Sequence, residues 1–204
     1  VYYKDTPAYA YYPSKERSSE YRESLYVGYR YYTTVEKTTR FPFGYGLSYT
    51  TFEYKDLKVD AEGVTFTIEN TGNVTGVEVA QLYIGKKSDT VFRPVRELKG
   101  FARVELSPGQ QKEVRIPFDD KTFRFYDIRT DTWEIESGAY QIMVGKDAEH
   151  MVLKDTLQVK GTVDNGGYNK KELPEYFNGQ IREISDEKFK ILYGKEIPDG
   201  SWSG

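Results

Sequence analysis

Apolar and polar residues alternate with a period of two along several short runs between residues 52 and 159. In the run VTFTIEN, Phe66 and Ile68 would point to one side of an extended chain and Thr67 to the other. Such alternation is typical of β-strands that bury one face. The runs predict strands at residues 52–59, 64–70, 77–85, 97–106, 112–118, 139–145 and 153–159.

Turn-forming stretches such as NTGNVTG and SPGQ separate these runs. About seven short strands, with turns at intervals near ten residues and no helical pattern between them, predict a mainly β fold, an immunoglobulin-like β-sandwich of fibronectin type III-like topology. Pro117 lies within a run and has no N–H to donate, so its strand should be an edge or carry a bulge. The side chains expected in the core are Phe66, Ile68, Leu82, Ile116, Ile142 and Val144.

Both ends of the chain depart from this pattern. Of the 19 tyrosines, 13 lie in the first 54 residues without a regular period, which predicts an irregular N-terminal segment. Near the other end PEYFNG reads as a turn, and a short helix is predicted between Ser185 as N-cap and Gly194, with Phe189 and Leu192 on one face. A helix of about two turns is not stable by itself. We therefore expect both ends to need a partner.

Composition and charge exclude several classes of function. Lys and Arg total 29 against 32 for Asp and Glu, so no basic field is present to attract a phosphate backbone, and we expect no nucleic acid partner. With no cysteine, disulfides and cysteine-ligated zinc are excluded, and we expect no metal site and no cofactor. No apolar run suggests a membrane span or a signal segment, so we expect no membrane partner, and the cytoplasm is favoured. The start at Val1 is poor evidence about the compartment.

Candidate catalytic chemistry is sparse along the whole sequence. The motifs GxSxG, HExxH, the Walker loop and GxGxxG are all absent. The single histidine, His150, fits a turn better than a catalytic or metal site. The pair Asp119 and Asp120 and the glycosylation pattern at Asn73 also fit turns. We therefore expect no catalytic residue in this chain.

The tyrosine-rich start is the one candidate binding surface. A tyrosine ring offers a sugar a flat apolar face with a polar tip. Within YAYYPS, Tyr11 and Tyr12 are the residues that we expect to bind substrate at the rim of a sugar site. The alternative, which the pattern favours, is that the tyrosines of this region form a domain interface.

Two neighbouring stretches, YRESLYVGYRYYTT and RFPFGYGLSYTTF, closely resemble a segment of glycoside hydrolase family 3, the β-glucosidases and their relatives. In that family the segment ends the α/β sandwich domain and begins the fibronectin type III-like domain. VRELKGFARVELSPGQ and GAYQIMVG then resemble the family's sandwich in matching order. The tail SDEKFKILYGKEIP resembles the connection toward the catalytic barrel in members with a permuted domain order.

The resemblance implies three parts: residues 1–50 as the C-terminal piece of an α/β sandwich domain and a linker, 51–161 as the fibronectin type III-like domain, and 162–204 as a linker with a short helix. It implies a noncatalytic part of a β-glucosidase that hydrolyses terminal β-linked glucose with retention. The family's catalytic carboxylates would lie outside this chain, so the chain alone should be inactive. Its partners would be the catalytic barrel and the α/β sandwich domain. The alternative is a stand-alone carbohydrate-binding or structural β-sandwich module.

The resemblance implies that FPFGYGLSYTTF would be the covalent passage between the two sandwich domains, buried between both. It is free of charge and rich in aromatic residues, and such a surface is usually covered in soluble proteins. Gly44 and Gly46 would take backbone angles closed to other residues. The side chains expected at contacts with the other domains are Tyr26, Tyr29, Tyr31, Tyr32, Phe41, Phe43, Leu47, Phe52, Phe189 and Leu192.

Overall fold

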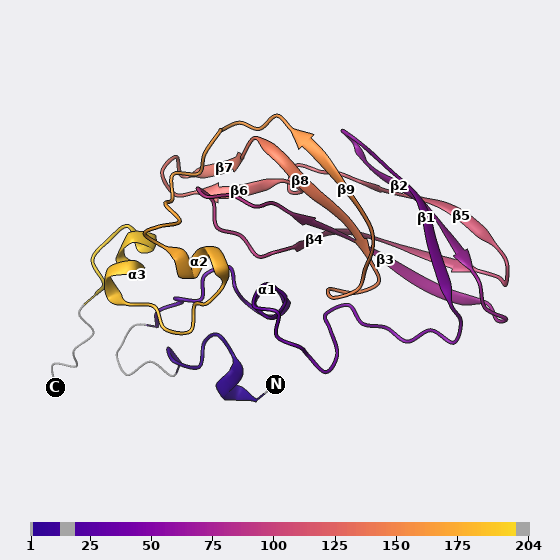
Figure 1. The fold of residues 1–204 in the computed structure, drawn as a ribbon, viewed down its shortest axis with the longest axis horizontal. Helices are drawn as coiled ribbons and strands as arrows, with labels where there is room; N and C mark the ends of the chain where they lie inside the picture. Colours follow the sequence, from indigo (N-terminus) through magenta and orange to yellow (C-terminus); the bar gives the residue numbers. More distant parts are fainter. Residues whose placement is uncertain (1, 13–18, 199–204) are drawn as a thin grey trace. The chain divides into compact units, whose positions relative to one another are not determined.

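The computed structural model describes residues 2–12 and 19–198 of the 204-residue chain. These residues fall into two compact units, which we describe separately (Figure 1). The sandwich unit consists of Phe41–Lys87 and Val95–Gly167. The terminal unit consists of the described parts of Val1–Arg40 and Tyr168–Gly204 together with the internal segment Ser88–Pro94.

The sandwich unit contains two antiparallel sheets, with the strand orders β1-β2-β5 and β4-β3-β8-β9. Two antiparallel sheets of three and four strands form a β-sandwich of the fibronectin type III-like kind, so the predicted fold class is confirmed. All seven predicted strands are present. Their bounds are β1 Phe52–Asp60, β2 Gly63–Asn70, β3 Gly76–Gly85, β4 Glu97–Leu106, β5 Gln111–Pro117, β8 Gly138–Gly145 and β9 Met151–Val159.

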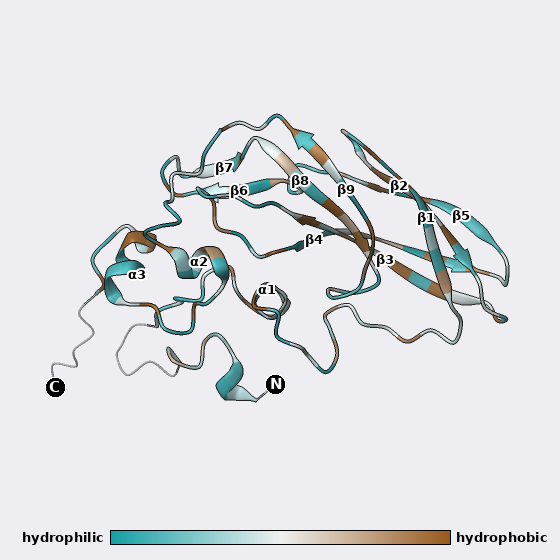
Figure 2. Ribbon diagram, in the orientation of Figure 1, coloured by the Kyte–Doolittle hydropathy of each residue, from teal (hydrophilic) through white to brown (hydrophobic). Residues whose placement is uncertain are grey.

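The core of the sandwich unit lies between these two sheets. The six side chains expected there are all buried, with at most 2% of each residue exposed. Figure 2 shows the corresponding hydrophobic stretches along β3 and β8. Tyr54 of β1 stacks on Phe66 of β2 with ring centroids 5.9 Å apart, whereas Thr67 is half-buried on the opposite face. The predicted inward and outward faces of β2 are therefore confirmed.

Two details of the sandwich concern its edges. Pro117 ends β5, which pairs only with β2 among the described strands, so the predicted edge strand is confirmed. The sequence did not predict the hairpin of β6, Arg124–Asp127, and β7, Thr132–Ile135. Each of these strands has four residues, too few for the alternation of apolar and polar residues to stand out.

The terminal unit contains short helices: η1 Tyr3–Asp5, α1 Tyr29–Thr34, α2 Pro174–Asn178 and α3 Asp186–Tyr193. Helix α3 is the predicted helix, because the Ser185 hydroxyl accepts a hydrogen bond from Lys188 N at 3.4 Å and Gly194 ends it with φ of 70°. The stretch PEYFNG, expected to be a turn, instead forms α2 and its C-cap Gly179. Proline suits the first position of this helix, because the backbone N–H of that position has no hydrogen-bond partner within a helix and its absence costs nothing.

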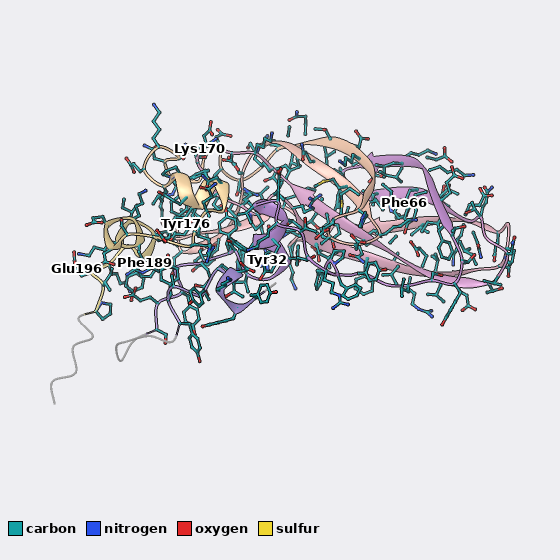
Figure 3. The ribbon with its side chains drawn as sticks, turned by 60° about the horizontal axis from the view of Figure 1, so that its bottom comes forward. Tyr32, Phe66, Lys170, Tyr176, Phe189 and Glu196 are labelled. Atoms are coloured by element: carbon teal, nitrogen blue, oxygen red, sulfur yellow. The ribbon has the colours of Figure 1, made fainter. Side chains whose placement is uncertain are left out.

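Some of the aromatic residues of the two chain ends, among them Tyr176, Phe189 and Tyr32, pack into one cluster within the terminal unit (Figure 3). Tyr26 and Tyr176 are fully buried, and the Tyr26 hydroxyl donates a hydrogen bond to the Tyr176 carbonyl oxygen. The expectation that these apolar side chains need an absent domain for their burial is wrong, because the two ends and Phe92 supply the contacts. The buried members are Tyr26, Tyr31, Phe92, Leu173, Tyr176, Ile181, Ile184 and Phe189, with Tyr32 and Leu192 packed against them.

Candidate functional site

The segment between Phe41 and Tyr49, which we call the linker ribbon, exposes most of its large apolar side chains. In this chain it is not buried, although Phe52 at the start of β1 is. A contiguous exposed surface of this kind marks an interaction site more often than a free protein surface. The exposed fractions are 61% for Phe41, 50% for Phe43, 44% for Tyr45, 86% for Leu47 and 101% for Tyr49.

The backbone of the linker ribbon is fastened to the sandwich unit by a buried glutamine. Gln81 Nε2 donates to the carbonyl oxygens of Gly44 and Lys146, at 3.1 and 3.0 Å. Gln81 Oε1 in turn accepts from the Tyr83 hydroxyl at 2.7 Å, and Ala148 N donates to Phe43 O at 2.9 Å. These bonds hold the backbone while the neighbouring aromatic side chains stay exposed, so the surface is ordered before any partner binds.

Gly44 is required at its position for two reasons. Its φ is 81°, a region that side chains disfavour, and a Cβ there would lie 2.4 Å from Gln81 Oε1. Gly46, for which we expected the same freedom, does not have a positive φ. Sequence reasoning missed Gln81 itself, although a glutamine within the apolar run VEVAQLYIG was a visible signal.

Two further exposed apolar side chains lie next to Gln81 on the four-stranded sheet. Phe101 of β4 lies directly opposite Gln81 of β3 in the strand register, so both side chains point to the same outer face. Phe101 is 69% exposed, and Val79, two residues before Gln81 on the same face, is also exposed. Gln81, which holds the linker ribbon, therefore has two exposed apolar neighbours on this face, Val79 and Phe101.

The predicted substrate-binding residues have different surroundings in the terminal unit. The Tyr11 hydroxyl accepts from Ile184 N at 2.6 Å and donates to Ile181 O at 3.1 Å, and burial raises the pKa of this phenol. Tyr12 is 65% exposed, and its carbonyl oxygen accepts from the Tyr3 hydroxyl at 2.7 Å. Tyr11 is therefore an anchor to the C-terminal segment, whereas the ring of Tyr12 is open to solvent. The Pro13 and Ser14 that follow lie outside the described residues.

The residues set aside as turn residues do lie in turns. His150 lies between β8 and β9 with Nδ1 2.8 Å from both Asp147 carboxylate oxygens. Asp119 accepts from Lys121 N at 2.9 Å, and Asp120 pairs with Arg124 at 2.9 Å. Asn73 is exposed between β2 and β3.

Groups of metal-binding side chains and membrane-spanning helices are both absent from the described residues. No group of three or more His, Cys, Asp or Glu side chains there could hold a metal ion. None of the described helices has the length and apolar character needed to cross a bilayer.

Comparison with known proteins relates this fold to one group of enzymes. A family model described as the fibronectin type III-like domain matches residues 78–148. The protein named "Probable beta-glucosidase K" of Emericella nidulans is 44% identical over 166 residues, which cover 80% of this chain and 20% of the relative. "Thermostable beta-glucosidase B" of Acetivibrio thermocellus is 40% identical over 165 residues, covering 77% of this chain and 22% of the relative.

Solved structures give the same relationship at the level of the fold. The GH3 β-glucosidase of Bifidobacterium adolescentis has a TM-score of 0.73 and 34% identity, covering 78% of this chain and 24% of that structure. The β-glucosidase of Kluyveromyces marxianus in complex with glucose has a TM-score of 0.71 and 36% identity, and the match covers 77% of this chain and 20% of that structure. The chain therefore spans about a fifth of the length of the curated relatives that it matches.

Proposed function

The chain corresponds to the region of family 3 β-glucosidases that includes their fibronectin type III-like domain, and on this premise we propose that it is a noncatalytic part that supports the catalytic domains. The parent enzyme would hydrolyse terminal β-linked glucose with retention. Its catalytic carboxylates would belong to the barrel and the α/β sandwich domain, which would be the partners of this chain. We assign no catalytic residue and no cofactor to these 204 residues. The division at residues 50 and 161 belongs to the same proposal.

The observation that carries this proposal is the linker ribbon. Five large apolar side chains are exposed on a backbone that the buried Gln81 holds in place. Burying a leucine or phenylalanine side chain gains about 1.5 to 3 kcal/mol, so a surface of this size favours a stable partner. A free-standing module would keep this surface in water, whereas a part of a larger enzyme would cover it with the neighbouring domains.

The proposal is tested with a chimera in which this chain replaces the matching region of the thermostable β-glucosidase B relative. We expect the chimera to hydrolyse an aryl β-glucoside, and we expect the isolated chain to show no turnover. In the chimera Leu47→Ser should lower the free energy of unfolding by about 1.5 to 3 kcal/mol. In the isolated chain the same change should have almost no effect, because Leu47 is 86% exposed.

Val74→Ser is the matched control, because Val74 is exposed in the turn before β3 and is not one of the five exposed side chains of the linker ribbon. Val74→Ser should leave the free energy of unfolding unchanged in both the chimera and the isolated chain. A folded but inactive chimera, in which Leu47→Ser and Val74→Ser behave alike, would contradict the supporting role and favour a stand-alone module.

We further propose that Tyr12 contacts the sugar of the parent enzyme, held in place by Tyr11. The exposed ring of Tyr12 has the flat apolar face that a sugar ring needs, and the two hydrogen bonds of Tyr11 fix the adjoining backbone. In the active chimera Tyr12→Ala should raise KM about tenfold with little change in thermal stability. Tyr21→Ala, at another exposed tyrosine, should leave KM unchanged. An unchanged KM in Tyr12→Ala would remove Tyr12 from the substrate site.

A further inference from the structure

The β6–β7 hairpin carries an exposed aromatic pair that the proposed function does not use. Tyr126 and Trp133 lie directly opposite each other in the strand register, with ring centroids 5.3 Å apart and planes at 76°. Trp133 is 53% exposed and Tyr126 is 43% exposed. The Arg124 guanidinium lies over the Trp133 ring, 4.2 Å from its centroid. These three side chains, which we call the hairpin platform, share one face of the ribbon because strand side chains alternate.

The opposite face of the hairpin anchors it. The Asp127 carboxylate is buried and accepts from Arg129 N at 2.9 Å and Nε at 3.0 Å, and these hydrogen bonds from Arg129 lower the pKa of Asp127. Arg129 Nη2 also donates to Asn165 O at 2.9 Å, beyond the last strand of the sandwich. The Tyr126 hydroxyl donates to Asp131 in the hairpin turn. The aromatic rings therefore stand on a fixed support, which lowers the entropy lost when a ligand binds.

The charges around the hairpin platform favour an uncharged ligand. Arg124 pairs with Asp120 at 2.9 Å, and Arg129 pairs with Asp127, so both arginines are neutralised by neighbouring carboxylates. What remains for a ligand is the exposed part of the two rings, with one face of Trp133 covered by Arg124. The Tyr126 hydroxyl and the carboxylates of Asp120 and Asp131 border these rings and can hydrogen-bond hydroxyls. A neutral sugar ring has this combination of an apolar C–H face and hydroxyl edges, whereas a phosphate or an acidic chain would need an unpaired cation.

We propose that the hairpin platform is an accessory binding site for neutral β-glucan oligosaccharides, with Trp133 as the stacking residue. The inference extends the proposed function, on which the choice of ligand rests, and adds a second contact to sugar in a region without catalytic groups. The site would hold a polymeric substrate near the enzyme without taking part in the reaction.

The test is a titration of the full chain with cellohexaose and, separately, laminarihexaose, followed by nuclear magnetic resonance. The chain has two tryptophans, so two indole N–H signals are expected, and Trp133→Phe assigns them. We expect the Trp133 signal and the backbone amides of β6 and β7 to shift and saturate. Trp133→Ala should weaken binding about tenfold, as judged from the backbone amides. Trp133→Phe, which keeps an aromatic face, should retain most of the affinity.

Tyr21→Ala is the control, because it removes an exposed aromatic ring elsewhere and should leave binding unchanged. Thermal unfolding of each variant checks that the fold is intact. The absence of a saturable shift at concentrations on the order of 10 mM, or equal affinity in Trp133→Ala, would overturn the inference. An inactive chimera with an intact Trp133 shift would refute only the supporting role, and an active chimera without the shift would refute only the accessory site.

Discussion

Replacing Ile68 by alanine is expected to lower the free energy of unfolding of the sandwich unit by about 2 to 5 kcal/mol. Ile68 is fully buried in β2, the central strand of its sheet, between Tyr54 of β1 and Lys112 of β5 in the register. Truncation removes buried methyl groups and leaves a cavity that strands paired on both sides cannot close. Urea unfolding monitored by circular dichroism measures the effect.

Thr67→Ala is the matched control one residue earlier. Its side chain points to the opposite face and is half-buried, so the change should cost roughly 0.5 to 1 kcal/mol. Equal losses for Ile68→Ala and Thr67→Ala would mean that the face assignment of β2 is wrong. Because a shift of one residue exchanges the two faces, this pair tests the register directly.

The sequence predicted the sandwich well because strands such as β2 and β5 bury one face and leave the other more exposed, although the second half of β3 is buried on both faces. That condition produces the alternation in runs such as VTFTIEN, and all seven strands formed where it appeared. The β6–β7 hairpin escaped prediction because each of its strands has only four residues, and its pattern would not have shown that Trp133 and Tyr126 are exposed. Hydrophobic pattern alone cannot distinguish an exposed aromatic face from a core face.

The partners of the unusual segments could not be predicted, because they lie far away in the sequence. The linker ribbon is held by Gln81, which donates a hydrogen bond to the carbonyl oxygen of Gly44, 37 residues earlier in the chain. The Tyr26 hydroxyl donates a hydrogen bond to the carbonyl oxygen of Tyr176, 150 residues later in the chain. Local composition indicated that both segments need contacts, and the structure shows such contacts for the two ends of the chain. Local composition did not indicate that the linker ribbon would remain exposed while the two ends of the chain would cover each other.

The candidate site illustrates the same limit on a smaller scale. Tyr11 and Tyr12 are adjacent and chemically identical, so the sequence offered no reason to separate them. In the structure only Tyr11 meets the backbone at Ile181 and Ile184, 170 and more residues away. This tertiary contact is the reason why we propose the exposed ring of Tyr12, and not that of Tyr11, as the sugar contact.

Replacing Tyr176 by alanine should unfold the terminal unit while leaving the sandwich unit folded. Tyr176 is fully buried, its ring centroid lies 5.3 Å from that of Phe92, and its hydroxyl donates to Arg22 O at 3.0 Å. Loss of a buried aromatic side chain costs about 3 to 5 kcal/mol, which is a large share of the stability of a unit built on short helices. Tyr176→Phe keeps the ring and should cost only about 1 kcal/mol.

Hydrogen exchange on the full chain separates the two units residue by residue. In Tyr176→Ala we expect amide protection to fall in α1, α2 and α3 and to remain in β1, β2, β3 and β8, because the sandwich has its own core. Tyr21→Ala, at an exposed tyrosine of the same unit, should leave both patterns unchanged. Equal loss of protection in both units would show that they unfold as one, and protection unchanged in α1 to α3 would mean that the aromatic cluster does not hold the chain ends together.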